Sequence, residues 1–187
     1  MEYCKLFSVL QQRDVCPVII RFLISMYTNQ TLRVKWGISI SDPFRCQNGV
    51  KQGGVLSPLL FCLYMDVLLN RLSCLQVGCH FGDHFCGALC YADDLTLLAP
   101  SRMAMSRLND ECESFARDFS VKYNPTKCVY LCYNDRSPNN PGVSINGTFV
   151  KKSASAVHLG HCLGPHCEKD TIIKAKCKLM SSVNPLF

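Results

Sequence analysis

The sequence predicts an α+β fold in which helices pack on an antiparallel sheet. Several segments carry apolar residues at helical spacing, and between them lie short stretches rich in β-branched and aromatic residues that end in turn residues. The 187 residues contain no internal repeat and no low-complexity linker. We therefore expect a single domain over residues 1–187.

The composition is that of a folded protein, with 48% hydrophobic and 18% charged residues. Twenty Lys and Arg against fourteen Asp and Glu give a net charge of +6, which favours polyanionic partners without requiring them. Arg21 and Asp66 interrupt the two best candidate membrane spans, so we expect no membrane partner. The fourteen cysteines include no CxxC pair and follow no secretory signal, which predicts reduced thiols in an intracellular protein.

Two helices are expected at the N-terminal end of the chain. Tyr3, Leu6, Phe7 and Leu10 recur at helical spacing and predict the first helix. Pro17 predicts the start of the second, because a proline in the first turn removes only an N–H group that has no helical partner there.

Residues 31–50 predict an extended hairpin, since they are rich in β-branched and aromatic residues and are broken by Gly37 and by Asp42-Pro43. Its basic residues are candidates for nucleic-acid contacts because they adjoin a glycine loop: Arg33, Lys35, Arg45 and Lys51. A second basic cluster lies near the C-terminus, where a solvated helix face is the simpler explanation: Lys169, Lys174, Lys176 and Lys178.

The glycine loop over residues 49–54 leads into a helix. We expect Ser57 to be its N-cap and Pro58 its first helical residue. One buried helical face is predicted from four apolar positions: Leu56, Leu60, Leu63 and Val67.

Strands and one more helix are expected over the rest of the chain. Residues 86–99 predict two short strands around a turn at residues 92–94. A helix with one apolar stripe facing the sheet should follow, through Met105, Leu108, Cys112, Phe115 and Phe119. Two further strands are predicted at 128–133 and 143–150, with a turn over 138–142 between them.

The turn at Tyr91-Ala92-Asp93-Asp94 places two carboxylates in the middle of an apolar hairpin. Two like charges roughly 4 Å apart repel by about 4 kcal/mol at an effective dielectric constant near 20. A solvated turn tolerates this repulsion, whereas a half-buried turn needs a cation or a shared proton. Carboxylates on a rigid turn suit Mg²⁺, which binds one or two carboxylates together with substrate phosphates. The pair therefore indicates phosphoryl or nucleotidyl transfer, with a solvated Asp-Asp turn as the alternative.

A second motif lies upstream of this pair, at Gly49-Val50-Lys51-Gln52-Gly53-Gly54-Val55-Leu56-Ser57-Pro58-Leu59-Leu60-Phe61. Together the two motifs resemble the palm of a reverse transcriptase, and are most similar to those of non-LTR (LINE-type) retrotransposons, over nearly the whole chain. The resemblance implies a right-hand polymerase palm without fingers or a full thumb. The palm would cover residues 1–150, and residues 151–187 would begin the primer-grip and thumb connection.

The same resemblance implies an RNA-directed DNA polymerase that works by two-metal nucleotidyl transfer. Its partners would be an RNA template, a DNA primer and dNTPs, and its cofactor Mg²⁺ or Mn²⁺. Asp93 would be the principal metal ligand, Asp94 the second carboxylate, and Tyr91 a neighbour of the primer terminus. Contacts to nucleotide or template are implied for Lys51, Gln52, Gly53, Gly54, Ser57 and Pro58.

Two weaker matches lie downstream. Asn124-Pro125-Thr126-Lys127 resembles an element of the family whose lysine assists the departure of pyrophosphate, which would make Lys127 catalytic. Leu159-Gly160 resembles the turn of the primer-grip hairpin.

The family's first catalytic Asp, in an Ala-Phe-Asp-like motif, would fall just before Met1. We therefore expect the isolated chain to polymerise little or nothing. Asp14, Asp42 and Asp66 are the upstream acids that could substitute, but turn, cap or surface roles are simpler for each.

Three other interpretations remain open. The first is a non-catalytic retroelement remnant that at most binds nucleic acid. The second is another right-hand polymerase, such as a group II intron-type enzyme or an RNA-dependent RNA polymerase, although the Gly-Gly-x-Leu-Ser-Pro block argues against the latter. The third concerns the Cys- and His-rich segment 158–167, whose residue types suit zinc but whose spacing fits no standard finger: His158, His161, Cys162, His166 and Cys167.

Overall fold

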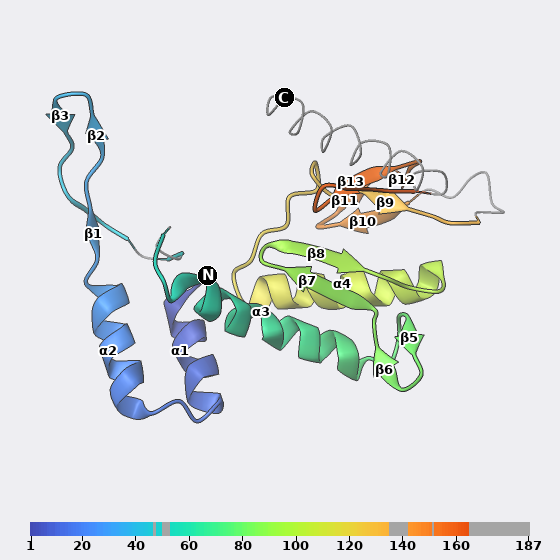
Figure 1. Cartoon of the computed structure of the whole chain (residues 1–187), viewed down its shortest axis with the longest axis horizontal. Coiled ribbons are helices and arrows are strands. Elements are labelled where there is room, and N and C mark those ends of the chain that lie inside the picture. The colour runs from blue at the N-terminus through green and yellow to red at the C-terminus, as the bar shows by residue number, and fades with distance from the viewer. Residues whose placement is uncertain (47, 50–52, 135–141, 151, 165–187) are drawn as a thin grey trace, which may run out of the picture. The chain divides into compact units, whose positions relative to one another are not determined.

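The structure is a computed structural model that describes residues 1–46, 48–49, 53–134, 142–150 and 152–164 (Figure 1). It divides into two compact units, Met1–Lys122 and Tyr123–Phe187. Within the described residues, no helix combines the length and the apolar character needed to span a membrane.

Among its described residues, the first unit contains four helices and eight short strands. The helices are α1 (Tyr3–Gln12), α2 (Pro17–Thr28), α3 (Ser57–Cys74) and α4 (Arg102–Asp118). The strands are β1 (Thr31–Leu32), β2 (Lys35–Trp36), β3 (Ser39–Ile40), β4 (Phe44–Arg45), β5 (His80–Phe81), β6 (His84–Phe85), β7 (Ala88–Tyr91) and β8 (Asp94–Leu97). They pair antiparallel as β1 with β4, β2 with β3, β5 with β6, and β7 with β8.

The two predicted N-terminal helices are confirmed. Helix α1 begins at Tyr3 and buries Tyr3, Leu6, Val9 and Leu10, and α2 begins at Pro17. The two helices contact each other, and the rings of Tyr3 and Tyr27 meet edge to face with centroids 5.3 Å apart. The spacing of apolar residues was sufficient to predict both helices because each helix buries one narrow face.

Helix α3 differs from the prediction in its start and in its buried face. The helix begins at Ser57, so Leu56 is the N-cap and Ser57 is not. The Ser57 N–H donates to the Gly54 carbonyl at 3.1 Å, and Leu56 already has helical backbone angles, so the turn tightens one residue early. The buried face is Leu60, Tyr64, Met65, Leu68 and Leu72, whereas Leu56 is exposed and Leu63 and Val67 are half-buried.

The physical reason for the shifted face is that α3 is apolar on nearly all sides. Periodicity alone cannot select a face on such a helix. The selection comes from its neighbours, because α3 contacts α1, α4 and β7.

The predicted stripe on α4 is confirmed at Leu108, Cys112, Phe115 and Phe119, which are buried, while Met105 is half-buried. The aromatic residues of the stripe pack on α3, since the Tyr64 ring lies 5.2 Å from Phe119 and 6.4 Å from Phe115. The stripe therefore faces a helix at this point, and the prediction that it faces the sheet needs correction.

The predicted extended hairpin is confirmed over residues 31–45, whereas Asn48 and Gly49 pair with Glu2 and Met1. It forms two short ladders, with β1 paired to β4 and β2 to β3. Between the ladders, the Ser41 N–H donates to the Val34 carbonyl at 2.9 Å.

The second unit contains six strands among its described residues: β9 (Tyr130–Leu131), β10 (Val143–Ile145), β11 (Thr148–Val150), β12 (Lys152–Ser153), β13 (Ala156–His158) and β14 (His161–Leu163). Residues 143–150 form the β10–β11 hairpin and not the single strand predicted, because Asn146 and Gly147 both take positive φ angles and turn the chain. Most of the turn predicted at 138–142 lies outside the described residues. Strand β9 is confirmed and pairs in parallel with β12.

The α+β class is thus confirmed, but the described strands do not form one sheet. They form separate two-stranded sheets, and within the described residues no strand pairs with more than one other. Most of these strands are two to four residues long and lie between turns, so each pair presents little edge on which a third strand could add.

Candidate metal and nucleotide site at the β7–β8 hairpin

The carboxylate pair lies where the sequence predicted, at the tip of a two-stranded hairpin. Tyr91 pairs with Asp94 across the hairpin, so Ala92 and Asp93 form the turn and Asp94 is already the first residue of β8. Ala92 has a φ of +52°, in the left-handed region that few residues other than glycine adopt.

The two faces of this hairpin differ. Side chains directly opposite each other share a face, and successive side chains alternate between faces. The Cys90–Leu95 pair is half-buried, whereas the Tyr91–Asp94 pair is exposed, with Tyr91 at 66% of its full accessibility. The tyrosine ring and the Asp94 carboxylate therefore lie side by side on the open face.

The electrostatic environment of the tip is negative. Asp93 and Asp94 are both exposed, and no Lys or Arg in the described part of the chain forms an ion pair with either of them. The pKa of the Cys90 thiol is raised, first by burial and then by the neighbouring Cys62, Asp93 and Asp94. The tip thus has unneutralised carboxylate oxygens, which are the ligands that Mg²⁺ and Mn²⁺ prefer.

The thiol of Cys90 is a part of the site that sequence reasoning missed. It donates to the Ala92 carbonyl at 3.3 Å and so supports the turn from inside. The alternation of the strand could have indicated this position, because Cys90 directly precedes Tyr91, and successive side chains of a strand point to opposite faces.

The glycine segment and the start of α3 follow the prediction in part. Gly53 has a φ of +76°, which only glycine adopts without strain, and apart from its chain neighbours no atom of the described residues lies within 4 Å of the position a Cβ would take there. Ser57 is buried in the first turn of α3, and Pro58 beside it is exposed. Lys51 and Gln52 lie outside the described residues.

The segment before this loop is tied to the N-terminal residues. The Gly49 N–H donates to the Met1 carbonyl at 2.9 Å, and Glu2 forms an antiparallel bridge with Asn48. Cys46 lies 3.7 Å from the Tyr3 hydroxyl. These contacts place the approach to the glycine segment beside the start of α1.

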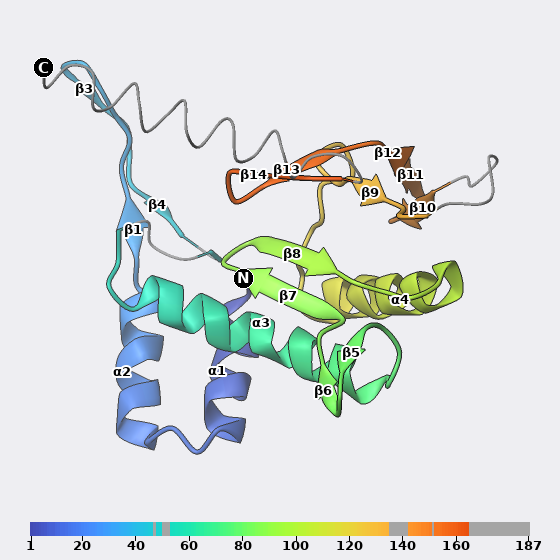
Figure 2. The same ribbon diagram turned by 45° about the vertical axis from the view of Figure 1, so that its right-hand side comes forward.

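In both views the β7–β8 hairpin runs along α3, with its turn at the end farther from β5 and β6 (Figures 1 and 2). The electrostatic influence of Cys62, in the second turn of α3, on Cys90 agrees with this position. Gly53 and Gly54 lead directly into the start of α3, so the carboxylate hairpin and the described end of the glycine segment are both joined to this helix.

Lys127 belongs to the second unit, where it is exposed. Its N–H donates to the Asn124 carbonyl at 3.1 Å, and the Asn124 side chain accepts from the backbone and hydroxyl of Thr126 at 3.1 Å and 2.7 Å. These bonds form a tight turn that presents the lysine to solvent.

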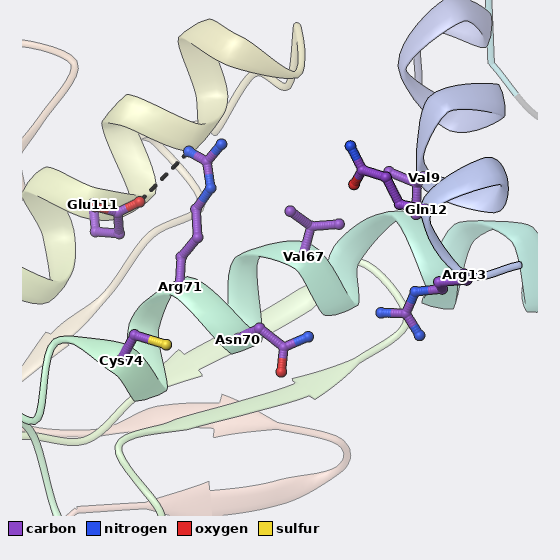
Figure 3. A pocket seen from close by; sticks show the side chains of 8 residues that line it. All are labelled: Val9, Gln12, Arg13, Val67, Asn70, Arg71, Cys74 and Glu111. Atoms are coloured by element: carbon purple, nitrogen blue, oxygen red, sulfur yellow. Dashed lines mark ion pairs between the residues drawn. The ribbon is translucent and has the colours of Figure 1, made fainter.

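Two other regions of the described chain contain none of the predicted carboxylate or glycine-segment residues. In the described part of the chain, no three His, Cys, Asp or Glu side chains are grouped to hold a metal ion. His158 and His161 face each other across the β13–β14 hairpin, while His166 and Cys167 lie outside the described residues. An open pocket of about 680 Å³ lies between α1, α3 and α4 (Figure 3), and none of the predicted site residues lines it.

The family model described as reverse transcriptase (RNA-dependent DNA polymerase) matches residues 4–164. The chain is 41% identical over 88 residues to the "Retrovirus-related Pol polyprotein from type-2 retrotransposable element R2DM" of Drosophila melanogaster, covering 47% of this chain and 8% of that protein. It is 30% identical over 131 residues to the "Retrovirus-related Pol polyprotein from type-1 retrotransposable element R2" of Nasonia vitripennis, covering 70% of this chain and 13% of that protein.

A third relative is the "RNA-directed DNA polymerase from mobile element jockey" of Drosophila melanogaster, with 25% identity over 118 residues, covering 60% of this chain and 12% of that protein. The chain thus matches only 8% to 13% of the length of these three relatives. The family match covers both motifs, the glycine segment and the carboxylate turn, and extends over most of the chain. This chain belongs to the reverse transcriptase (RNA-dependent DNA polymerase) family.

Proposed function

We propose that this chain is the palm part of an RNA-directed DNA polymerase in which Asp93 and Asp94 hold a divalent metal ion. One observation carries the proposal. Two adjacent carboxylates are exposed at the tip of a hairpin whose strand β7 contacts α3, the helix into which Gly53 and Gly54 lead, and no described cation forms an ion pair with either of them.

The residues at the tip suit a hard divalent cation. Their donor atoms are carboxylate oxygens, and a cation between them would relieve the repulsion of neighbouring like charges. Bound there, Mg²⁺ or Mn²⁺ would neutralise phosphate oxygens and favour ionisation of the primer's 3′ hydroxyl.

Each of the other site residues receives a proposed role. Tyr91, beside Asp94 on the open face, would contact the primer terminus. Gly53 and Gly54, with Lys51, Gln52 and Pro58, would line the path of nucleotide and template. Ser57 is buried, so we propose that it positions the start of α3 and does not touch nucleotide directly. Lys127 would donate a proton to the leaving pyrophosphate.

The proposed architecture is a right-hand polymerase palm over residues 1–150, followed by the start of a primer-grip and thumb connection over 151–187. In such a palm the hairpin with the carboxylates would lie beside a further strand of the sheet. RNA template, DNA primer and dNTPs would be its partners in the complete enzyme.

We further propose that this chain by itself polymerises little. The described residues bring no third carboxylate to Asp93 and Asp94, and two metal ions ordinarily need at least one more. Asp66 is committed to an ion pair with Arg13. Asp14 lies just after α1 with a φ of +55°, and Asp42 lies in the hairpin before Pro43, so both have ordinary turn positions.

Mn²⁺ binding tests the metal assignment directly. Electron paramagnetic resonance of free Mn²⁺ would measure its affinity for the chain and for Asp93→Asn and Asp94→Asn. We expect one weak site, with which Mg²⁺ competes, and an affinity at least about tenfold lower in each variant, since each removes a charged ligand. Asp83→Asn, at the turn of the β5–β6 hairpin, is the matched control and should bind like the parent chain.

Equal Mn²⁺ affinity in all four proteins would overturn the assignment. If the parent chain binds RNA but no Mn²⁺, the result would favour the second candidate, a non-catalytic remnant that binds nucleic acid. The basic hairpin over residues 31–45 is the observation that supports this second candidate.

A further inference from the structure

The hairpin of residues 31–45 carries exposed aromatic and cationic side chains that the carboxylate site does not use. In each of its ladders, a cation lies on one face and an aromatic ring on the other, because successive side chains alternate. The cross-strand pairs are Thr31 with Arg45, Leu32 with Phe44, Lys35 with Ile40, and Trp36 with Ser39.

Trp36 is the most exposed aromatic side chain of this hairpin, at 85% of its full accessibility. It lies next to the turn that joins β2 to β3, and both views show these strands at the end of the ribbon farther from α2 (Figures 1 and 2). Val34 and Ile38 near it are also exposed. The chain itself covers little of this indole, so its ring face is available to an external planar group.

The cations of the hairpin are equally available. Arg33, Lys35 and Arg45 are exposed, and no carboxylate in the described ranges forms an ion pair with any of them. The chain as a whole carries a net charge of +6. These cations therefore favour a polyanionic partner.

The combination of an open ring and unpaired cations favours nucleic acid over an acidic protein. Single-stranded nucleic acid offers both complements in one polymer, since its bases stack on aromatic side chains and its phosphates bind Lys and Arg. An acidic protein surface would match the cations but would leave the indole without a planar partner.

We propose that this hairpin binds single-stranded nucleic acid that passes around the edge of the narrow ribbon and so reaches both faces, with a base stacked on Trp36 and phosphates held by Arg33, Lys35 and Arg45. The inference rests on the proposed function for its choice of polymer, since a template strand is single-stranded where it is copied. It does not depend on Asp93 or Asp94.

The sequence provides an unusually direct probe, because Trp36 is its only tryptophan. Titrating the full chain with unlabelled oligouridylate should quench the tryptophan fluorescence, and the quenching should saturate together with the anisotropy of a fluorescein-labelled oligouridylate. Trp36→Ala should weaken binding about tenfold, as expected for one lost stacked base. Trp36→Phe keeps a ring and should retain most of the affinity.

Salt dependence tests the cations separately. The triple variant Arg33→Gln, Lys35→Gln, Arg45→Gln should bind more weakly, and its plot of log affinity against log salt should be shallower by about 2, since each lost phosphate contact contributes about 0.7. Matched controls lie elsewhere in the first unit. Phe81→Ala removes a ring that is 81% exposed on another hairpin, and Arg102→Gln with Arg107→Gln removes exposed cations of α4.

Three results would overturn the proposal. One is unchanged tryptophan fluorescence when the labelled oligonucleotide is saturated. Another is a Trp36→Ala variant that binds as tightly as the parent chain. The third is fluorescence that responds to protein concentration and not to oligonucleotide, which would assign the hairpin to contacts between copies of the chain. Circular dichroism would detect a misfolded variant. In that case the quenching experiment on the parent chain still tests whether oligouridylate binds beside Trp36. The Mn²⁺ experiment on Asp93 and Asp94 is independent, so each proposal can fail alone.

Discussion

The hydroxyl group of Tyr64, in the middle of α3, donates a hydrogen bond to the backbone carbonyl of Phe119 at the end of α4. The same hydroxyl accepts a hydrogen bond from the backbone N–H of Glu2 at 3.3 Å. One buried side chain thus joins the N-terminal residues to both long helices. The Ser120 hydroxyl strengthens this junction by donating to the Glu2 carboxylate at 3.0 Å.

Tyr64→Phe should destabilise the fold by about 1–3 kcal/mol, because it removes both bonds and leaves two backbone groups without this partner. Urea unfolding followed by helical circular dichroism would measure the change. Tyr91→Phe removes a hydroxyl from an exposed ring and should leave the unfolding free energy within about 0.5 kcal/mol of the parent value. If both variants unfold alike, the junction contributes nothing to stability.

Arg71 on α3 holds Asp118 on α4 in its charged form. Its guanidinium donates to the Asp118 carboxylate at 2.8 Å, and this bond lowers the pKa of Asp118. A lowered pKa stabilises the fold above the ordinary carboxyl value of about 3.9, and this contribution is lost as the pH falls through the folded-state value. Arg71 also lies over the rings of Phe119 and Phe115, at 5.4 Å and 5.8 Å from their centroids.

Arg71→Gln should therefore raise the pKa of Asp118 toward its ordinary value, as measured by a carboxyl NMR titration. Arg107→Gln, on the exposed surface of α4, should leave this titration unchanged. The destabilisation by Arg71→Gln should have a part that disappears in acid, which belongs to the ion pairs of Arg71 with Asp118 and Glu111, and a part independent of pH, which belongs to the ring contacts. A pKa that stays low in Arg71→Gln would contradict the assignment.

Tyr3 makes the first unit sensitive to alkali. Burial, and then the hydrogen bond with the Cys46 thiol, raise the pKa of Tyr3 from 10.0 to about 12. Because the raised pKa favours the neutral phenol in the folded state, its contribution is complete below pH 10 and is lost as the pH rises toward 12. Tyr3→Phe should remove this part of the pH dependence, as measured by unfolding free energies across that interval. The exposed Tyr133 provides the control variant Tyr133→Phe, which should change the unfolding free energy at neutral pH by less than about 0.5 kcal/mol.

Primer extension tests the expected inactivity of the chain. With an RNA template, a DNA primer, dNTPs and Mg²⁺ or Mn²⁺, we expect incorporation at background level in both the parent chain and Asp93→Ala, because two carboxylates alone hold two metal ions poorly. Incorporation by the parent chain that Asp93→Ala abolishes would contradict this expectation, although it would support the role of Asp93.

Much of the candidate site could be predicted from sequence because its geometry is local. The Asp93–Asp94 turn follows from four residues between two short apolar stretches, and the positive φ of Gly53 belongs to a residue type that permits it. The role of Cys90 could not be predicted with the same ease. Its altered pKa depends mainly on burial beneath the hairpin and on Cys62, which lies far from it in sequence.

The local pattern of residues by itself determined α1, α2, the α4 stripe, the β7–β8 hairpin and the membership of the reverse transcriptase family, since each depends on neighbours a few positions apart. Only the tertiary structure decided which face of α3 is buried. An all-round apolar helix has no preferred face until other elements contact it, and α1, α4 and β7 together select the face of Leu60, Tyr64, Leu68 and Leu72. The contact of β7 with α3, and the electrostatic influence of Cys62 on Cys90, likewise join the carboxylate hairpin to the helix into which Gly53 and Gly54 lead.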